Sequence, residues 1–85
     1  MAHSIEFSSS ADKELDALSG DVRTRILKAV SKLSGNPRPS GCKKLKGQDA
    51  YRIRVGAYRV IYEIRDAVLI VWVVKVGHRS NVYQD

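Results

Sequence analysis

The chain has 85 residues, 44% of them hydrophobic and 28% charged, and its fifteen Lys and Arg against nine acidic residues give a net charge of +6. This length and balance indicate one small globular domain over residues 1–85 and exclude a disordered chain. The longest uncharged apolar run, residues 67–74, is too short to cross a bilayer, and the first residues lack a signal peptide's basic start and apolar stretch. With a lone cysteine, Cys42, no internal disulfide is possible, and we expect a cytoplasmic protein with no membrane partner.

The positive charge is concentrated in the second half of the chain. Through Pro37, five basic residues are balanced by five acidic ones, whereas the 48 residues that follow carry ten basic and four acidic residues. Such asymmetry indicates a polyanionic partner. No basic amphipathic helix suited to an anionic membrane is visible, so nucleic acid is the favoured partner.

The first third of the chain predicts a strand followed by two helices. Apolar and polar residues alternate over residues 3–7, as in a strand. Serines 8–10 offer an N-cap for a first helix, which Gly20 is expected to end. Asp21 is expected to cap the second helix. The apolar positions of the two helices are Ala11, Leu15 and Leu18, then Val22, Ile26, Ala29, Val30 and Leu33, while the basic residues of the second, Arg25 among them, are expected in solvent.

The second part of the chain predicts three consecutive strands. Residues 34–41 are rich in turn residues and form a loop, and residues 42–47 are a basic cluster with Leu45 as its apolar anchor. Strands are expected over residues 50–55, 58–64 and 68–76, the last of them apolar on both faces and therefore central, with Gly77 as its end. The order β-α-α-β-β-β predicts an α+β fold, an antiparallel sheet with an αα-hairpin packed on one face.

The second and third predicted strands form a hairpin that carries an unusual set of charges. If Gly56 and Ala57 are the two turn residues, Arg54 lies directly opposite Arg59, and Arg52 lies on the same face. Like charges opposed across a strand pair are destabilising. Either this is a solvated face on which the guanidinium groups splay apart, or it is a cradle for an anion such as a phosphate chain.

The residue inventory narrows the chemistry that this face could perform. The two histidines, one cysteine and scattered acids match no metal-ligand spacing, and no phosphate-binding glycine loop is present, so no metal or other cofactor is expected. Arginine, lysine, tyrosine and histidine remain. Such a set can cleave RNA, because the 2′-hydroxyl is an internal nucleophile and the protein need only orient it, move protons and stabilise the phosphorane.

Four blocks of sequence, in order, resemble the RelE toxins of type II toxin–antitoxin systems. They are Lys-Leu-Lys-Gly, Tyr-Arg-Ile-Arg-Val, Tyr-Arg-Val-Ile-Tyr and Val-Gly-His-Arg-Ser-Asn-Val-Tyr, at residues 44–47, 51–55, 58–62 and 76–83. The resemblance covers nearly the whole chain. It implies a metal-independent, ribosome-dependent endoribonuclease that cuts mRNA in the ribosomal A site and so stops translation and growth. It also implies a cognate antitoxin, and the ribosome with its mRNA and ribosomal RNA, as partners.

The resemblance also assigns roles to individual residues. Arg59 matches the family arginine that stabilises the transition state, Arg79 matches a second catalytic arginine, and Tyr83 matches the tyrosine proposed as general base. Arg52 and Arg54 stand where well-studied relatives carry lysines. Because arginine binds phosphate but is a poor proton donor at neutral pH, these two are expected to bind substrate and stabilise charge rather than to act as acids.

The remaining basic residues have two interpretations each. His78 could shuttle a proton or be a surface histidine. Lys43, Lys44 and Lys46 could contact ribosomal RNA or substrate phosphates, or form a solvated cluster. Tyr83 could be catalytic or pack on the sheet edge. Trp72 and the tyrosines at 51, 58 and 62 could stack bases, although strand aromatics more often belong to the core.

Two other functions are compatible with the same fold. One is a ParE-like toxin that inhibits DNA gyrase without cutting RNA, which would not need the set Arg59, Arg79 and Tyr83. The other is a non-catalytic module that binds RNA or the ribosome. Cleavage of translated mRNA after induced expression would separate the nuclease from both.

Overall fold

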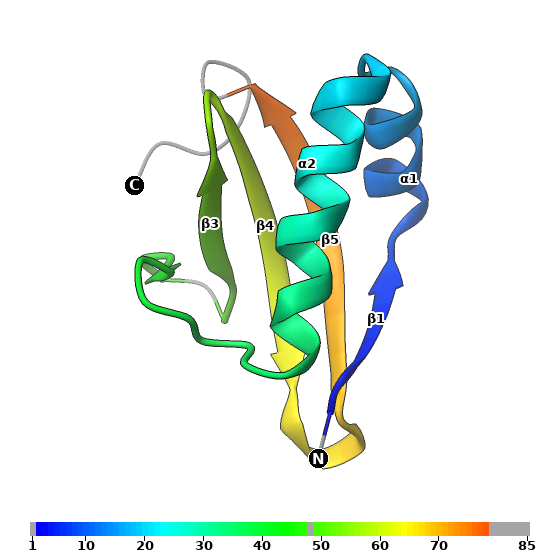
Figure 1. The fold of residues 1–85 in the computed structure, drawn as a ribbon. Helices are drawn as coiled ribbons and strands as arrows, with labels where there is room; N and C mark the ends of the chain where they lie inside the picture. The colour runs from blue at the N-terminus through cyan, green and yellow to red at the C-terminus, as the bar shows by residue number, and fades with distance from the viewer. Residues whose placement is uncertain (1, 48, 79–85) are drawn as a thin grey trace.

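The computed structural model describes residues 2–47 and 49–78, which form two helices beside a five-stranded sheet (Figure 1). The predicted α+β class is confirmed. In chain order the elements are β1 (Ser4–Phe7), α1 (Ser9–Asp16), α2 (Gly20–Ser31), the 3₁₀ turn η1 (Lys32–Ser34), β2 (Lys43–Lys44), β3 (Tyr51–Val55), β4 (Tyr58–Arg65), the 3₁₀ turn η2 (Asp66–Val68) and β5 (Ile70–His78).

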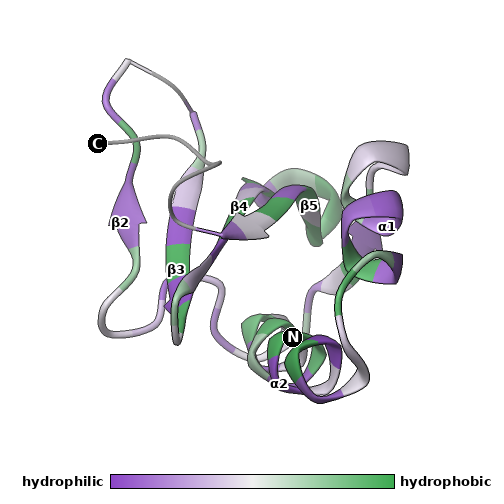
Figure 2. Ribbon diagram, turned by 90° about the horizontal axis from the view of Figure 1, so that it is seen from above, coloured by the Kyte–Doolittle hydropathy of each residue, from purple (hydrophilic) through white to green (hydrophobic). Residues whose placement is uncertain are grey.

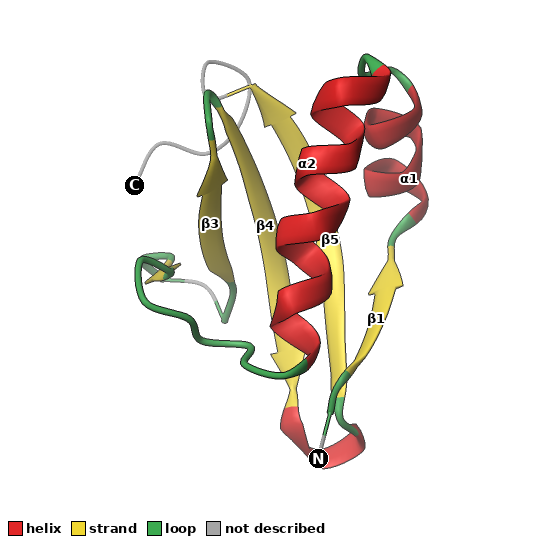
Figure 3. Cartoon of the chain, in the orientation of Figure 1, coloured by secondary structure: helices red, strands yellow, loops and turns green. Residues whose placement is uncertain are grey.

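The sheet has the order β1-β5-β4-β3-β2 and is mixed rather than purely antiparallel (Figure 3). Strands β2 to β5 are joined in antiparallel pairs, but β1 runs parallel to β5, with Ser4 opposite Ile70 and Phe7 opposite Val73. Strand β5 is thus paired on both sides, as its two-sided apolar pattern predicted. It also extends through Gly77 to His78, so the predicted end at Gly77 is wrong: these two residues continue the ladder opposite Arg59 and Tyr58.

Both helices pack on one face of the sheet and enclose the main core (Figure 2). The hydroxyl of Ser8 accepts a hydrogen bond from the Ala11 N–H at 3.1 Å and so caps α1, as the serine run predicted. Helix α1 ends at Asp16, well before Gly20. Gly20 instead opens α2 after Ser19, and Asp21 lies in the first turn rather than at the cap. The fully buried side chains of this core are Ile26, Val30, Leu33, Val60, Tyr62, Val71, Val73 and Val76.

A smaller apolar cluster lies on the opposite face of the sheet. Leu45 and Ala50 pack there against Ile61, with Val74 beside them, and the Leu45 N–H donates to the Ala50 carbonyl at 2.9 Å. Leu45 is therefore the anchor that the sequence predicted. The cluster holds the chain between β2 and β3 against the face that carries the arginines.

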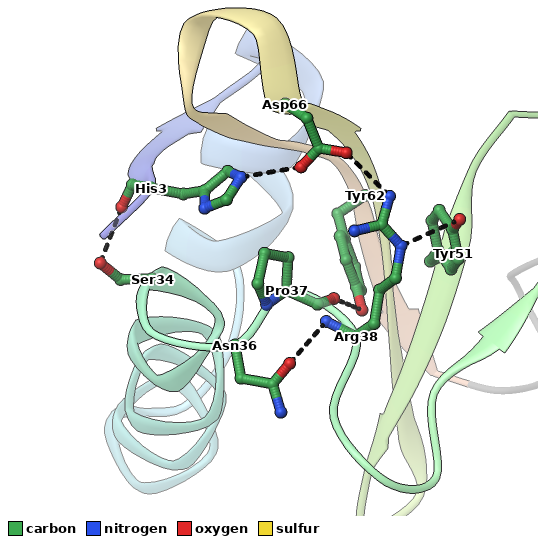
Figure 4. Close-up of polar contacts among 8 residues, drawn as sticks. All are labelled: His3, Ser34, Asn36, Pro37, Arg38, Tyr51, Tyr62 and Asp66. Carbon is green, nitrogen blue, oxygen red and sulfur yellow. Dashed lines mark hydrogen bonds and ion pairs between the residues drawn. The ribbon is translucent and has the colours of Figure 1, made fainter. Parts of the chain in front are cut away.

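A polar network fastens the long loop after α2 to the sheet (Figure 4). The buried Tyr62 hydroxyl donates to the Pro37 carbonyl at 2.7 Å. The Arg38 guanidinium donates to the Tyr51 hydroxyl at 3.3 Å and to the Asp66 carboxylate at 3.0 Å, and His3 Nε2 lies 3.0 Å from the same carboxylate. Burial raises the pKa of Tyr62 above its ordinary value, while the hydrogen bonds from Arg38 and His3 lower the pKa of Asp66.

Within residues 2–47 and 49–78, no helix is long and apolar enough to span a bilayer.

Candidate functional site

The hairpin of β3 and β4 has the predicted register. Val55 pairs with Tyr58, Arg54 with Arg59, and Arg52 with Ile61, which leaves Gly56 and Ala57 as the two turn residues. Gly56 has a φ of +61°, a left-handed value that glycine adopts without steric cost. A positive φ at the first central residue, followed by a negative one, is the pattern of a type II′ turn, which matches the twist of antiparallel strands.

The three hairpin arginines share the sheet face that the helices leave uncovered, but they differ in exposure. They lie on the same side as Ile61 of the smaller apolar cluster, whereas Ile53 and Val60 point into the main core. Arg54 is exposed, while Arg52 and Arg59 are only 6% and 9% exposed. The solvated-face interpretation therefore fits Arg54 alone. Burial limits the conformations of the other two side chains, so their positive charges are held in fixed places.

Neighbouring strands extend the row of basic residues. Lys43 of β2 pairs with Arg52, so the two share a face. On the other side of the hairpin, Lys75 of β5 pairs with Ile61, but its ammonium group forms an ion pair with Glu14 at 2.9 Å. Lys44 pairs with Tyr51, whose ring packs against the main core, and so lies on the other face from Arg52. The result is a cationic strip across β2, β3 and β4, made of Lys43, Arg52, Arg54 and Arg59.

The exposed lysines 43, 44 and 46 do not form one group. Lys44 and Lys46 line an open hollow of about 530 Å³ together with Leu45, Gly47 and Asp49. Lys43 alone joins the cationic strip. Of the three candidates for RNA contact in this segment, Lys43 is thus the one that the fold brings beside an arginine.

A small cavity lies at the tip of the hairpin, next to the strip. It has a volume of about 90 Å³ and is lined by Arg54, Gly56, Ala57, Tyr58 and Arg59. Two guanidinium groups beside a cavity large enough for several water molecules suit an anion, because guanidinium donates paired hydrogen bonds to phosphate oxygens. The tip is therefore a candidate site for a phosphate group.

His78 lies close to the hairpin but not on its arginine face. Its ring meets the Tyr58 ring edge to face, with centroids 5.6 Å apart, and both residues alternate onto the side that the helices cover. This placement favours the surface histidine over the proton shuttle. Arg79 and Tyr83, the other two residues expected to be catalytic, lie outside the described residues.

The aromatic residues divide between core and surface. Tyr51 and Tyr62 stack with centroids 6.0 Å apart against the main core, and Tyr58 packs there too, so the core interpretation of the tyrosines is confirmed. Trp72 is half-buried on the uncovered face, where the Arg65 guanidinium lies 4.9 Å from its ring centroid. The two line a hollow of about 290 Å³ with Glu6 and Ile70.

Within residues 2–47 and 49–78, no group of three or more His, Cys, Asp or Glu side chains could hold a metal ion. One contact near the site came only from the structure. Arg25 of α2 is exposed, as predicted, and its guanidinium also lies against the hairpin turn at Gly56. No sequence pattern could have found this contact, because the packing of a helix on a hairpin fixes it.

Comparison with known proteins gives consistent matches over nearly the whole chain. The family model described as the ParE toxin of the type II toxin–antitoxin system parDE matches residues 5–83. The mRNA interferase toxin RelE of Escherichia coli strain K12 is 33% identical over 90 residues, which cover 100% of this chain and 94% of that protein. Among solved structures, the isolated E. coli RelE toxin is 29% identical with a TM-score of 0.81, covering 99% of this chain and 88% of that one.

Similar chains have also been solved in complexes. The toxin chain of the intact E. coli RelBE toxin–antitoxin complex is 31% identical with a TM-score of 0.81, covering 91% of this chain and 96% of that one. The archaeal RelE–RelB complex from Pyrococcus horikoshii gives 27% identity and a TM-score of 0.83, covering 96% and 100%. The shared fold thus includes the hairpin and the face that carries its arginines.

Proposed function

Because the chain belongs to the RelE/ParE family and is a type II toxin–antitoxin toxin of the RelE kind, we propose that it is an endoribonuclease that cuts mRNA in the ribosomal A site. The observation that carries this proposal is the cationic strip, in which Arg52 and Arg59 are buried and Arg59 lines, with Arg54, a cavity of about 90 Å³. The mRNA interferase name of the E. coli relative supports the same activity.

The reaction uses the 2′-hydroxyl of the RNA as nucleophile. Its oxygen attacks the adjacent phosphorus, the bond to the 5′-oxygen breaks, and a 2′,3′-cyclic phosphate and a free 5′-hydroxyl result. Arg59 stabilises the negative charge that develops on the phosphorane, since its buried guanidinium needs little rearrangement as the charge grows. Arg52 and Arg54 bind the substrate phosphates, and Lys43 extends this contact along β2.

Proton transfer is assigned to the segment that follows β5. Tyr83 takes the proton from the 2′-hydroxyl, and Arg79 stabilises the charge on the leaving 5′-oxygen, which takes a proton from water to become the 5′-hydroxyl. A tyrosine acts as base only when neighbouring cations lower its pKa, so this role requires cations close to Tyr83. No metal or other cofactor takes part.

Dependence on the ribosome follows from how little the protein itself provides. The described part of the proposed site offers charged groups for phosphates and a tip cavity of about 90 Å³, and neither of these aligns the 2′-oxygen with the leaving group. In-line alignment contributes much of the barrier reduction in such reactions. The ribosome, which holds the mRNA in a defined conformation, supplies this alignment, and ribosomal RNA is the second polyanion that the basic surface contacts.

We also propose that a cognate antitoxin protein neutralises the toxin. Its support is that the similar E. coli and P. horikoshii chains were solved as toxin–antitoxin complexes. Inhibition of DNA gyrase is the second candidate function, favoured by the ParE description of the matching family model.

Mapping of RNA 5′ ends after induced expression tests the proposal. Codon-phased cuts in translated messages are expected, and they should disappear in Arg79→Ala and Tyr83→Phe variants that still bind the antitoxin. Growth arrest without any such cuts, accompanied by DNA damage, would replace the nuclease with the gyrase inhibitor. Purified protein should leave naked RNA almost intact.

A further inference from the structure

A third arginine approaches the hairpin tip from the opposite side. Arg25 of α2 projects from the helix layer to the turn, where its Nη2 lies 3.0 Å from the position that a Cβ on residue 56 would occupy. Glycine at this position thus serves two purposes: it adopts the positive φ that the turn requires, and it leaves room for the guanidinium.

Two of the three charges at the tip, those of Arg25 and Arg54, are not compensated by the described residues around them. Arg25 and Arg54 are both exposed, and neither makes a hydrogen bond or an ion pair with any residue in 2–47 or 49–78. Asp21, one helical turn before Arg25, forms no ion pair with it either. Arg59 lies directly opposite Arg54, so three guanidinium groups surround a two-residue turn. Like charges gathered in this way are destabilising unless an anion binds among them.

The three groups are arranged around the turn rather than along one face. Arg54 and Arg59 lie on the uncovered face and line the cavity of about 90 Å³, whose wall includes Gly56. Arg25 reaches the same glycine from the helix-covered side. A single phosphate bound in the cavity would contact Arg54 and Arg59. Arg25 would then contact a neighbouring phosphate of a chain that passes over the tip.

We propose that Arg25 and the hairpin tip form an additional phosphate-binding subsite, which holds the RNA backbone beside the bond that is cut. This inference rests on the proposed RNA substrate. RNA is favoured over an acidic peptide because the tip adjoins the strip whose residues are proposed to bind phosphates, and because a polymer with one phosphate per nucleotide can meet charges on both sides of the turn. Arg25 touches no reacting atom and is a binding residue.

The salt dependence of RNA binding measures this contact directly. The probe is a short single-stranded RNA carrying 2′-O-methyl groups throughout, which cannot be cleaved because its nucleophile is blocked. Each phosphate neutralised contributes about 0.7 to the slope of log affinity against log salt for single strands. Arg25→Ala should therefore lower the slope by about 0.7. The ratio of the wild-type affinity to that of Arg25→Ala should then fall by about 2.6-fold when the salt concentration is raised fourfold.

Lys32→Ala is the matched control. It removes the same charge from an exposed position directly after the last residue of α2, about 10 Å further along the axis at 1.5 Å per residue. Its slope should equal that of the wild type. Arg25→Lys should restore most of the slope, since an ammonium still neutralises a phosphate although it cannot make the paired contact. Circular dichroism and thermal unfolding check that all three variants fold.

A second measurement concerns the reaction on the ribosome. Arg25→Ala should raise KM for mRNA cleavage and leave kcat unchanged, as expected when an interaction is equal in ground and transition states. Equal slopes for Arg25→Ala and wild type would overturn the inference, and so would an equal drop for Lys32→Ala. Loss of binding to a glutamate-rich peptide with RNA binding intact would assign the site to an acidic protein partner instead. The slope does not require cleavage, so the inference and the nuclease proposal can fail separately.

Discussion

Replacing Arg54 with threonine should stabilise the protein while weakening RNA binding. Arg54 and Arg59 are directly opposed in the hairpin, and Arg54 has no partner in the described part of the chain. Opposed residues have Cβ atoms about 5 Å apart. With charges splayed to about 6 Å in water, the repulsion is about 0.7 kcal/mol. Screening with a Debye length of about 10 Å at 0.1 M salt leaves about 0.4 kcal/mol, which corresponds to a rise in Tm of about 2 to 3 °C.

Urea unfolding at several salt concentrations is the assay. The gain from Arg54→Thr should fall to about 0.1 kcal/mol at 1 M salt, where the Debye length is about 3 Å. Lys44→Thr is the control, because it makes a similar change on the neighbouring strand opposite the uncharged Tyr51. A stabilisation that does not depend on salt would reflect strand propensity rather than repulsion and would refute the reasoning, as would destabilisation.

Two further predictions concern the polar network that fastens the loop after α2. Burial holds the pKa of Tyr62 above its ordinary value, so its contribution to stability is complete below about pH 10 and is lost as the pH rises further. Tyr62→Phe should cost about 1 to 3 kcal/mol at neutral pH, because it leaves the Pro37 carbonyl unpaired. In urea titrations, the variant's free energy of unfolding should also fall less steeply with pH in the alkaline range than that of the wild type. Hydrogen bonds from Arg38 and His3 lower the pKa of Asp66, so its contribution to stability is present above about pH 4 and is lost as the pH falls through the folded-state pKa. Asp66→Asn should reduce the slope of the free energy of unfolding against pH in the acid range, as measured by urea titrations. An unchanged slope would contradict the pairing seen in the structure.

The hairpin register could be predicted because its signals are local. A Gly-Ala pair between two alternating segments leaves one two-residue turn, and this choice fixes Arg54 opposite Arg59. The period of two then fixes which side chains share a face. Local patterns of this kind, in the helices as well as in the strands, explain why the order of elements and the α+β class could be predicted from the chain alone.

The burial of the arginines could not be predicted. Alternation places Arg52 and Arg59 on the uncovered face but does not say what packs over it, and exposures of 6% and 9% depend on contacts between distant segments. The parallel pairing of β1 with β5 has the same origin, since four residues of strand carry no signal for a partner 66 positions away. The prediction that Gly20 ends the first helix was wrong, because a glycine between two helices can end the first or begin the second.

The double pairing of β5 has a consequence for how the protein folds. This strand joins the first strand of the chain to the hairpin, so the sheet remains in two unconnected parts until β5 inserts between them. Pairing of residue 4 with residue 70 demands closure of a loop that spans most of the chain. Proteins dominated by such distant pairings fold in about milliseconds to seconds rather than microseconds. Amide hydrogens of Val71 and Val73, in the part of this strand that is paired on both sides, should exchange only on global unfolding.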